Sequence, residues 1–527
     1  MTNKLDKTSK RKNTSEALAV SDYSSYLYLI YIFGFYPIIT HNKYFDITVT
    51  RYSSFMAGTL AYIFLCGMSI IVCKMLEGSV NTRLRHAFAM AGEKWFERPF
   101  VWMFFLMVAH ILAYTDAYDA AEVMVGPASR YMGLVTWLVM GVMFILMAQG
   151  VRPEERLFIP LALSALYACV IAIFQHMEID FMNYKGSIKE SLYTKFISTF
   201  GNINMFASFL GMVIPLFAAL FILTKRAYIR YASAVLLFPC GMCIMICNSD
   251  SIFLALFAGL FVALLLALRA RQPVRFALAL CLLAAGNLST ILVNKYGHAR
   301  YDSKRGGLII YLDKVPAALI ILGATLILLG LTVIFKAKIN ALCDRVGVKR
   351  IAIVLTVLVA VIMIATVIVG VTVIKKGVFK FDYKWGSKRG YIWTKTAELF
   401  KDAPLRNKLF GYGDESLKSL MTDYYYTEMI DVTGTVYDNA HCEPLHYLIT
   451  TGITGLLAYL GLLFVTIRSV IKRGLDCGPA CCLLAAVFGY LGQSLITISQ
   501  PITTPLFFVM LATMSGFSRT CKPRNAA

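Results

Sequence analysis

The chain has 527 residues, of which 58% are hydrophobic, with a mean hydropathy of +0.67 and a formal net charge of +21. This composition excludes an ordinary soluble protein and indicates a protein that crosses a membrane many times. The positive charge does not indicate nucleic-acid binding, because most of it lies in short segments between apolar runs, where it favours contact with anionic lipids of the inner leaflet.

Apolar runs close to the length of a membrane-spanning helix recur along the whole chain. They predict an all-α fold, a polytopic bundle of about 14 transmembrane helices (12–14), with a short first and last helix. Residues 1–22 are polar and rich in Lys, Ser and Thr, and we expect a disordered tail there. The runs lie at residues 24–41, 52–75, 99–116, 131–149, 157–177, 203–224, 232–249, 251–268, 276–293, 316–337, 351–375, 446–467, 478–498 and 504–518.

The distribution of Lys and Arg predicts the orientation of these helices, because short cytoplasmic segments carry an excess of basic residues. With the N-terminus inside, the inner segments hold 29 Lys and Arg residues and the short outer segments hold 11. The other 11 lie in one long outer segment, to which the rule does not apply. We therefore expect cytoplasmic tails at 1–22 and 519–527, helices 1–11 within 23–375 and helices 12–14 within 446–518.

The longest outer segment, 376–445, is expected to contain short helices and is electrically polarised. Its charge balance is +6 over residues 376–408 and −5 over residues 409–440. A ligand with phosphate groups would be drawn to the basic half. The acidic half is rich in tyrosine and suits sugars, which bind carboxylates and aromatic rings; an ordinary solvated loop is the alternative interpretation. The tyrosines are Tyr424, Tyr425, Tyr426 and Tyr437.

A polar motif, Asn439-Ala-His441-Cys-Glu443-Pro444-Leu-His446, comes just before a hydrophobic run. Pro444 suits the first turn of a helix, and Glu443 is favoured beside a helix N-terminus. His441 then precedes the helix at the membrane–water boundary, where a histidine has a pKa suited to general-base catalysis near neutral pH. A structural histidine is the alternative. The spacing is not that of a helical zinc site, so we expect no metal.

Three blocks of this sequence resemble the O-antigen ligase/polymerase superfamily, and together they cover about residues 195–470. The first is the Asn439-Ala-His441 run with Glu443, followed by Thr451-Gly452-Ile-Thr-Gly455. The second is Gly201-Asn202-Ile-Asn204, where a helix starts at the outer face. The third is Arg389-Gly-Tyr391-Ile-Trp393 with Pro404 and Gly411-Tyr-Gly413.

Two departures from the family pattern stand out. The family has Asn after the histidine, where this chain has Cys442. The family also has Ser-Arg-Gly at an outer helix junction, where this chain reads Asn248-Ser249-Asp250-Ser251. One of the two phosphate-binding arginines of the family is therefore absent from its usual position, and Lys304 or Arg305 in the next outer segment is the expected substitute.

The resemblance implies a metal-independent, cofactor-free glycosyltransferase in the bacterial cytoplasmic membrane. Its donor would be an undecaprenyl-diphosphate-linked glycan, which it transfers or polymerises onto a glycan or lipid acceptor at the outer face, among membrane lipids and without nucleic acid. His441 would be the catalytic base. The donor diphosphate would be bound by Arg389, Arg305 and Lys304, with support from Glu443, Trp393, Tyr391, Asn202 and Asn204.

The alternative function is a flippase or transporter for a lipid-linked oligosaccharide or polysaccharide. Such a protein would be expected to show two similar halves and ionisable residues within its helices. Neither feature is clear in this sequence. A long outer segment that carries His and Arg is also unnecessary for transport, and it favours the enzyme.

Overall fold

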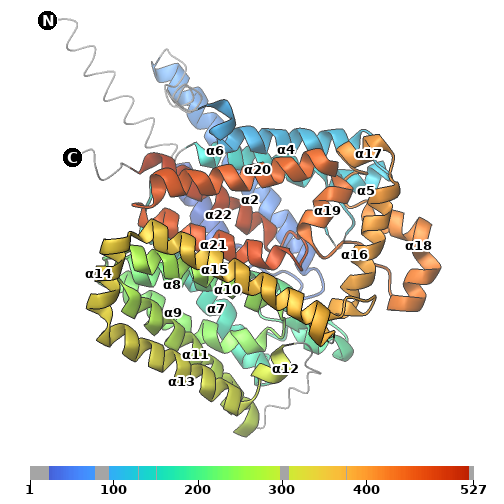
Figure 1. Ribbon diagram of the computed structural model, residues 1–527. Helices are drawn as coiled ribbons and strands as arrows, with labels where there is room; N and C mark the ends of the chain where they lie inside the picture. The colour runs from blue at the N-terminus through green and yellow to red at the C-terminus, as the bar shows by residue number, and fades with distance from the viewer. Residues whose placement is uncertain are drawn as a thin grey trace, which may run out of the picture.

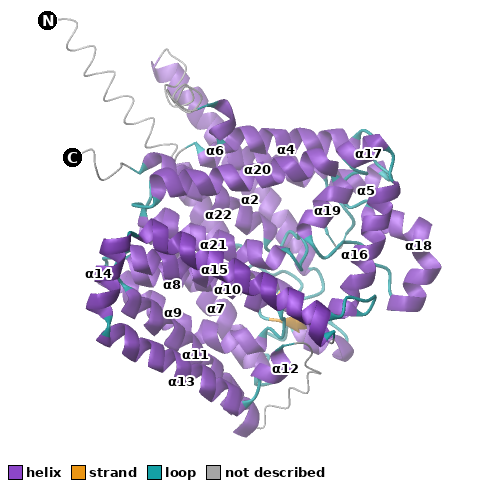
Figure 2. Ribbon diagram, viewed as in Figure 1, coloured by secondary structure: helices purple, strands orange, loops and turns teal. Residues whose placement is uncertain are grey.

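A computed structural model describes residues 23–77, 94–128, 130–149, 151–296, 308–375 and 377–521. Helices make up almost all of the regular structure in this part of the chain (Figure 2). Two strands, β1 (Phe196–Ile197) and β2 (Gly201–Asn202), form one short antiparallel pair. The predicted all-α class is therefore confirmed.

Long apolar helices run side by side and form the body of the molecule (Figure 1). Each of the predicted apolar runs overlaps one of them. They are residues 23–30 with their continuation η1 (Tyr31–Phe35), α2 (Ile47–Glu77), α4 (Pro99–Tyr114), α6 (Leu134–Ala148), α7 (Ile159–His176), α8 (Ile203–Leu223), α9 (Ala227–Ile246), α10 (Ser251–Arg269), α11 (Pro273–Tyr296), α13 (Val315–Ile334), α15 (Val348–Val369), α20 (Gly452–Ser469), α21 (Gly478–Ser494) and α22 (Thr504–Thr520).

Shorter helices connect them, and several gather at one end of the body (Figure 1). They are α5 (Ala120–Val125), α12 (Ile309–Leu312), α14 (Lys336–Val346), α16 (Trp385–Asp402), α17 (Leu405–Phe410), α18 (Leu417–Thr433) and α19 (Glu443–Thr450). Single turns of tighter or wider helix are η2 (Trp95–Glu97), η3 (Glu155–Phe158), η4 (Lys185–Ser187), η5 (Glu190–Lys195), η6 (Gly370–Ile374), η7 (Gly377–Phe379) and η8 (Val470–Gly474).

Eight helices of the described residues are long and apolar enough to cross a membrane, which confirms a multi-spanning protein. Three further apolar helices, α4, α6 and α21, are shorter. The count of about 14 crossings stays a prediction. The eight spans are Glu155–His176, Ile203–Leu223, Ala227–Ile246, Ser251–Arg269, Pro273–Tyr296, Val315–Ile334, Val348–Ile374 and Gly452–Gly474.

Helix α8 lies at the centre of the bundle, because 94% of its apolar stretch is buried by other parts of the protein. It packs against α9, α10 and α21. A Cβ on Gly211 of α8 would collide with Ala255 of α10, and a Cβ on Gly489 of α21 would collide with the Gly211 carbonyl. Small residues at such contacts let membrane helices approach backbone to backbone, which is how they gain packing energy without a hydrophobic driving force.

The predicted span 446–467 is divided in two, which corrects its boundary. Helix α19 ends at Thr450, and α20 starts at Gly452, whose φ of +68° interrupts the helical path. The carbonyl oxygens of Ile449 and Thr450 accept hydrogen bonds from the amides of Tyr412 and Gly413 instead of from a continuing helix. The stretch that is long and apolar enough to cross a membrane therefore starts at Gly452, and α19 precedes it next to the polar segment.

Candidate active site

The polar segment folds into a small unit at one end of the bundle, formed by α16, α17, α18 and α19 (Figure 1). It has a hydrophobic core of its own, which joins α16, α18, α19 and the residues just before α19. This core fixes the two ends of the segment relative to each other, so that Arg389 and His441 are held on one framework. Its buried members are Tyr391, Ile392, Leu399, Leu417, Leu420, Met421, Met429, Ala440 and Ile449.

His441 is held in an unusual backbone conformation, with a φ of +51°. Its amide donates a hydrogen bond of 3.0 Å to the side-chain oxygen of Asn439. The preceding carbonyl, that of Ala440, accepts a bond of 3.0 Å from the Trp393 indole. A non-glycine residue stays in the left-handed region only where its surroundings determine it, and such positions cluster at functional sites.

Arg389 marks the start of the regular part of α16. The three residues before it, Gly386 to Lys388, have positive φ angles, and the helix straightens only afterwards. The guanidinium donates a hydrogen bond of 2.7 Å, from Nη1 to the Gly386 carbonyl, while its buried Nε atom has no partner in the part of the chain that the structure describes. Burial lowers the pKa of Arg389, and Tyr437 and Asp250 are the groups that oppose this shift.

Tyr437 connects the two predicted site residues. Its ring lies edge to face with the His441 imidazole at a centroid distance of 5.9 Å, and it interacts electrostatically with Arg389. Arg389 in turn influences His441. The structure therefore brings Arg389 and His441 to one place, although 52 positions separate them in the sequence.

The pKa of His441 falls to about 3, because the ring is buried and because Arg389 and Arg130 disfavour a positive charge on it. The imidazole is thus neutral, the form that accepts a proton. The expected pKa near neutrality does not hold, because His441 is not exposed at a water boundary as the sequence predicted. A negatively charged ligand beside Arg389 would raise this pKa again.

His446 and Glu443, the two other ionisable residues of the motif, have different surroundings. His446 lies in the first turn of α19, is buried and pairs with the Asn439 side chain at 3.2 Å, and burial lowers its pKa to about 4. Glu443 does not cap its own helix. Its buried carboxylate accepts hydrogen bonds from Tyr490 (2.5 Å), Ser499 (3.0 Å) and Tyr459 (3.3 Å), so it ties the start of α19 to α20, α21 and the segment after α21.

The remaining supporting residues brace the site from different elements. Trp393 holds the Ala440 carbonyl, and Tyr391 is fully buried in the core of the polar segment. Asn202 caps α8 by accepting a bond from the Asn204 amide, and the Asn204 side chain accepts a bond of 2.7 Å from Ser249. These contacts indicate structural roles. Lys304 and Arg305 lie outside the described residues.

One basic residue and several acidic residues near the site were not predicted from the sequence. Arg130, from the segment between α5 and α6, makes a two-point ion pair with Asp438. Asp250 lies near Arg389 and accepts the amide hydrogens that begin α12. Glu415 is buried, its Oε2 atom has no hydrogen-bond partner within the described ranges, and burial raises its pKa to about 8. The available signal for Arg130 was that it is the sole basic residue in a short predicted outer segment, 117–130.

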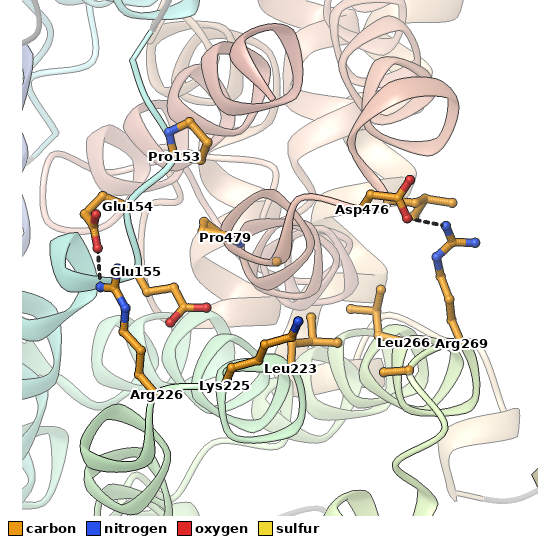
Figure 3. A pocket seen from close by; sticks show the side chains of 13 residues that line it. Pro153, Glu154, Glu155, Leu223, Lys225, Arg226, Leu266, Arg269, Asp476 and Pro479 are labelled. Atoms are coloured by element: carbon orange, nitrogen blue, oxygen red, sulfur yellow. Dashed lines mark hydrogen bonds and ion pairs between the residues drawn. The ribbon is translucent and has the colours of Figure 1, made fainter. Parts of the chain in front are cut away.

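A cavity of about 460 Å³ lies where α8 and α10 end and α21 begins, at the opposite end of these helices from the polar segment. Figure 3 shows the side chains that line it. None of the predicted site residues that the structure describes lines it. Two ion pairs join charged residues of its lining, Arg226 with Glu154 and Arg269 with Asp476, and the Glu155 carboxylate accepts a hydrogen bond from the Thr224 hydroxyl.

Residues 306–460 match a protein-family model described as O-Antigen ligase. The match confirms the resemblance to the O-antigen ligase/polymerase superfamily that the motif blocks indicated. Two of those blocks, from Arg389 to Gly413 and from Asn439 to Gly455, fall inside it, and the Asn202 block lies before it. No curated protein matches the chain.

Proposed function

We propose that this chain, which carries an O-antigen ligase segment at residues 306–460, is a glycosyltransferase of the bacterial cytoplasmic membrane. It would transfer or polymerise an undecaprenyl-diphosphate-linked glycan on the outer face, onto a glycan or lipid acceptor. The observation that carries the proposal is the meeting of Arg389 and His441, two residues of separate motif blocks, around Tyr437.

The reaction needs a base that takes a proton from the acceptor and a cation that stabilises the negative charge on the leaving diphosphate. The acceptor hydroxyl oxygen attacks the anomeric carbon of the donor and forms the new C–O bond. The bond from that carbon to the diphosphate oxygen breaks, and its electron pair stays on undecaprenyl diphosphate. The hydroxyl proton passes to the neutral His441 imidazole, which is the role of a general base.

Arg389 is suited to hold the donor diphosphate. Its planar guanidinium can bind two phosphate oxygens at once, and none of the described residues partners its buried Nε atom. Fixed donors that face a developing negative charge stabilise the transition state, so the reaction can proceed without a metal when cations hold the diphosphate. Lys304 and Arg305 stay candidates for a second phosphate contact.

The proposal is tested by transfer from purified lipid-linked glycan in vitro. His441→Ala should lose about 10²–10⁴-fold in rate, the usual cost of removing a general base. His446→Ala is the matched control: another imidazole five residues along, buried on the other side of the helix start, which should retain most of the activity. Both proteins should insert normally, and cells with His441→Ala should accumulate the lipid-linked donor.

Equal loss in both variants would remove His441 from its catalytic role. Full activity of His441→Ala would contradict the enzyme itself. In that case, movement of labelled lipid-linked glycan across vesicles that contain the protein would identify a flippase.

A further inference from the structure

The ion pair between Arg130 and Asp438 connects two parts of the chain that are 308 positions apart. Arg130 Nε lies 3.0 Å from Asp438 Oδ2, and Arg130 Nη2 lies 2.6 Å from Asp438 Oδ1. Both side chains are mostly buried, with 13% and 22% of their surface exposed. Two parallel bonds between a guanidinium and a carboxylate fix orientation as well as distance.

We propose that Arg130 and Asp438 are a positioning pair, which holds His441 in place and cancels the Asp438 charge beside its imidazole. This proposal rests on the function proposed above, because it assigns these residues to the support of its base. Neither residue touches the substrate in this role.

The first support is the way in which residues 438–441 are anchored. Asp438 is held by Arg130, Ala440 is held by the Trp393 indole, and the Asn439 side chain accepts a hydrogen bond from the His441 amide. His441 follows at once, in a left-handed conformation. A strained residue persists only when its neighbours over-determine it. Arg130 is the contact that attaches this short segment to the body of the bundle through the start of α6.

The second support is electrostatic. The charged or titratable groups that act on His441 are Arg389 of α16, Arg130, Asp438 and His446 of α19. Asp438 alone would favour the protonated imidazole, which cannot accept a proton. Although burial works in the opposite direction, Arg130 holds the pKa of Asp438 below its usual range, so the carboxylate stays charged and paired. The pair thus leaves little net charge beside the ring.

The geometry argues against a direct role of Arg130 in binding a phosphate. The Nε and Nη2 atoms, one complete edge of its fork, are taken by the two oxygens of Asp438. Among the described residues, in contrast, no carboxylate bonds the Arg389 guanidinium, and its Nε has no partner. An incoming diphosphate would have to displace Asp438 from Arg130, whereas Arg389 has a donor available.

The test compares the full-length protein in detergent with Arg130→Met, Asp438→Leu and the double variant. Diethyl pyrocarbonate modifies only the neutral imidazole, so the pH dependence of His441 modification, read by mass spectrometry, reports its pKa without any transfer reaction. Arg130→Met leaves the Asp438 carboxylate unpaired beside His441 and should raise the midpoint by about one pH unit or more. The double variant should return it towards the native value.

Transfer activity supplies the second readout. Arg130→Met should lose about tenfold or more, and the double variant should recover much of that loss, because an apolar pair can replace a buried ion pair while a single unpaired charge cannot be tolerated. Arg269→Met is the matched control, since it breaks the Arg269–Asp476 pair at the opposite end (2.9 Å) and should leave the His441 midpoint unchanged.

An unchanged His441 midpoint in Arg130→Met would overturn the positioning proposal. The proposal would also fail if the double variant were as inactive as Arg130→Met and its KM for the donor were raised. That result would make Arg130 a substrate ligand instead. If the native protein shows no transfer while the midpoint shifts as expected, the proposed function fails and the pairing of Arg130 with Asp438 beside His441 stands.

Discussion

Arg389 differs from the other arginines near the site in what its guanidinium does. One nitrogen bonds the Gly386 carbonyl, and the buried Nε finds no partner among the residues that the structure describes. Arg389→Ala should therefore reduce transfer by about 10²-fold or more, the usual cost of removing a donor that faces developing charge. Arg389→Lys keeps the charge but loses the two-point fork, so it should restore only part of the activity.

In vitro transfer from purified lipid-linked glycan measures this difference, with protein amounts matched by immunoblot. Lys401→Ala is a suitable control, because Lys401 is an exposed cation at the far end of the same helix. Glycan of normal amount and length from Arg389→Ala would remove Arg389 from the donor site. Full recovery in Arg389→Lys would show that charge alone is required.

The low pKa of His441 predicts a difference between two pH profiles. A base must be unprotonated, so a pKa lowered to about 3 keeps the free enzyme competent far into the acidic range. The profile of kcat/KM reports the free enzyme, and that of kcat reports the complex. Because a bound diphosphate adds negative charge beside Arg389, it should raise the pKa of His441, and the acid limb of kcat should lie at higher pH than that of kcat/KM.

Steady-state rates at saturating and limiting donor give the two limbs. The residual rate of His441→Ala should show neither limb. Coincident limbs would mean that the donor does not change the charge around His441, which would contradict a diphosphate bound at Arg389.

The residues of the site divide into those that local sequence predicts and those that only the fold supplies. Arg389 and His441 lie in motifs whose spacing is visible along the chain. Arg130 is a single residue in a short connection, and nothing in its own neighbourhood points to His441. Asp250 lies where the family has Ser-Arg-Gly, but only the fold brings it near Arg389. The pKa of His441 was also beyond local reasoning, because it depends on burial and on an arginine 311 positions away.

At the scale of elements, two motifs of the sequence turn out to contact each other. The Gly411-Tyr-Gly413 turn runs along the end of α19: the Tyr412 amide bonds the Ile449 carbonyl (3.1 Å), and the Gly413 amide bonds the Thr450 carbonyl (2.9 Å). A Cβ on Gly411 would collide with the Thr450 carbonyl. The two glycine motifs thus form one joint, which sets where α19 ends and where the membrane span begins.

Gly411→Ala should disrupt this joint. Its φ of +79° already disfavours alanine, and the collision with backbone adds to that, so we expect a loss of more than about 3 kcal/mol in stability or no folded protein. Gly434→Ala is the matched control: its φ is +70° but no atom lies within 4 Å of the added Cβ, so only about 1 kcal/mol of backbone strain is expected. Thermal unfolding in detergent measures both.

A Gly411→Ala protein as stable as Gly434→Ala would contradict the backbone contact between the two motifs. This joint also explains which helix boundaries the sequence could predict. Run length and hydropathy located the long helices, because lipid-facing and buried positions are both apolar. They could not locate the break between α19 and α20, since the apolar run passes through Thr451 and Gly452 without interruption, and the break depends on a contact with a segment about 40 positions earlier.

At the scale of the whole molecule, α8 and α10 connect two chemically different ends. Both start beside the polar segment, at Asn204 and Asp250, and both end at the cavity lined by Lys225, Arg226 and Arg269 (Figure 3). Helix α8 has 21 residues and is therefore about 30 Å long, close to the thickness of the hydrocarbon core. A single membrane slab would thus separate the basic cavity from the proposed active site.

This arrangement leads to a prediction of sidedness. Short basic connections favour the cytoplasm, so the cavity end should lie inside and residues 377–450 outside, with both termini in the cytoplasm. Single cysteines at Lys401 in α16 and at Lys472 in η8 test it, because both lysines are exposed and they lie on opposite sides in this topology. The background should carry Cys442→Ser, since Cys442 is the half-exposed cysteine next to the site.

In intact cells, an impermeant thiol reagent should label the Lys401→Cys protein and spare the Lys472→Cys protein, and permeabilisation should make both reactive. The reverse pattern would place Arg389 and His441 in the cytoplasm. Labelling of both in intact cells would mean that an even number of crossings, including zero, separates α16 from η8. Because α20 is the one long span between these two positions, that outcome would require α20 not to cross the membrane, and the proposed transfer at the outer face would lose its structural basis.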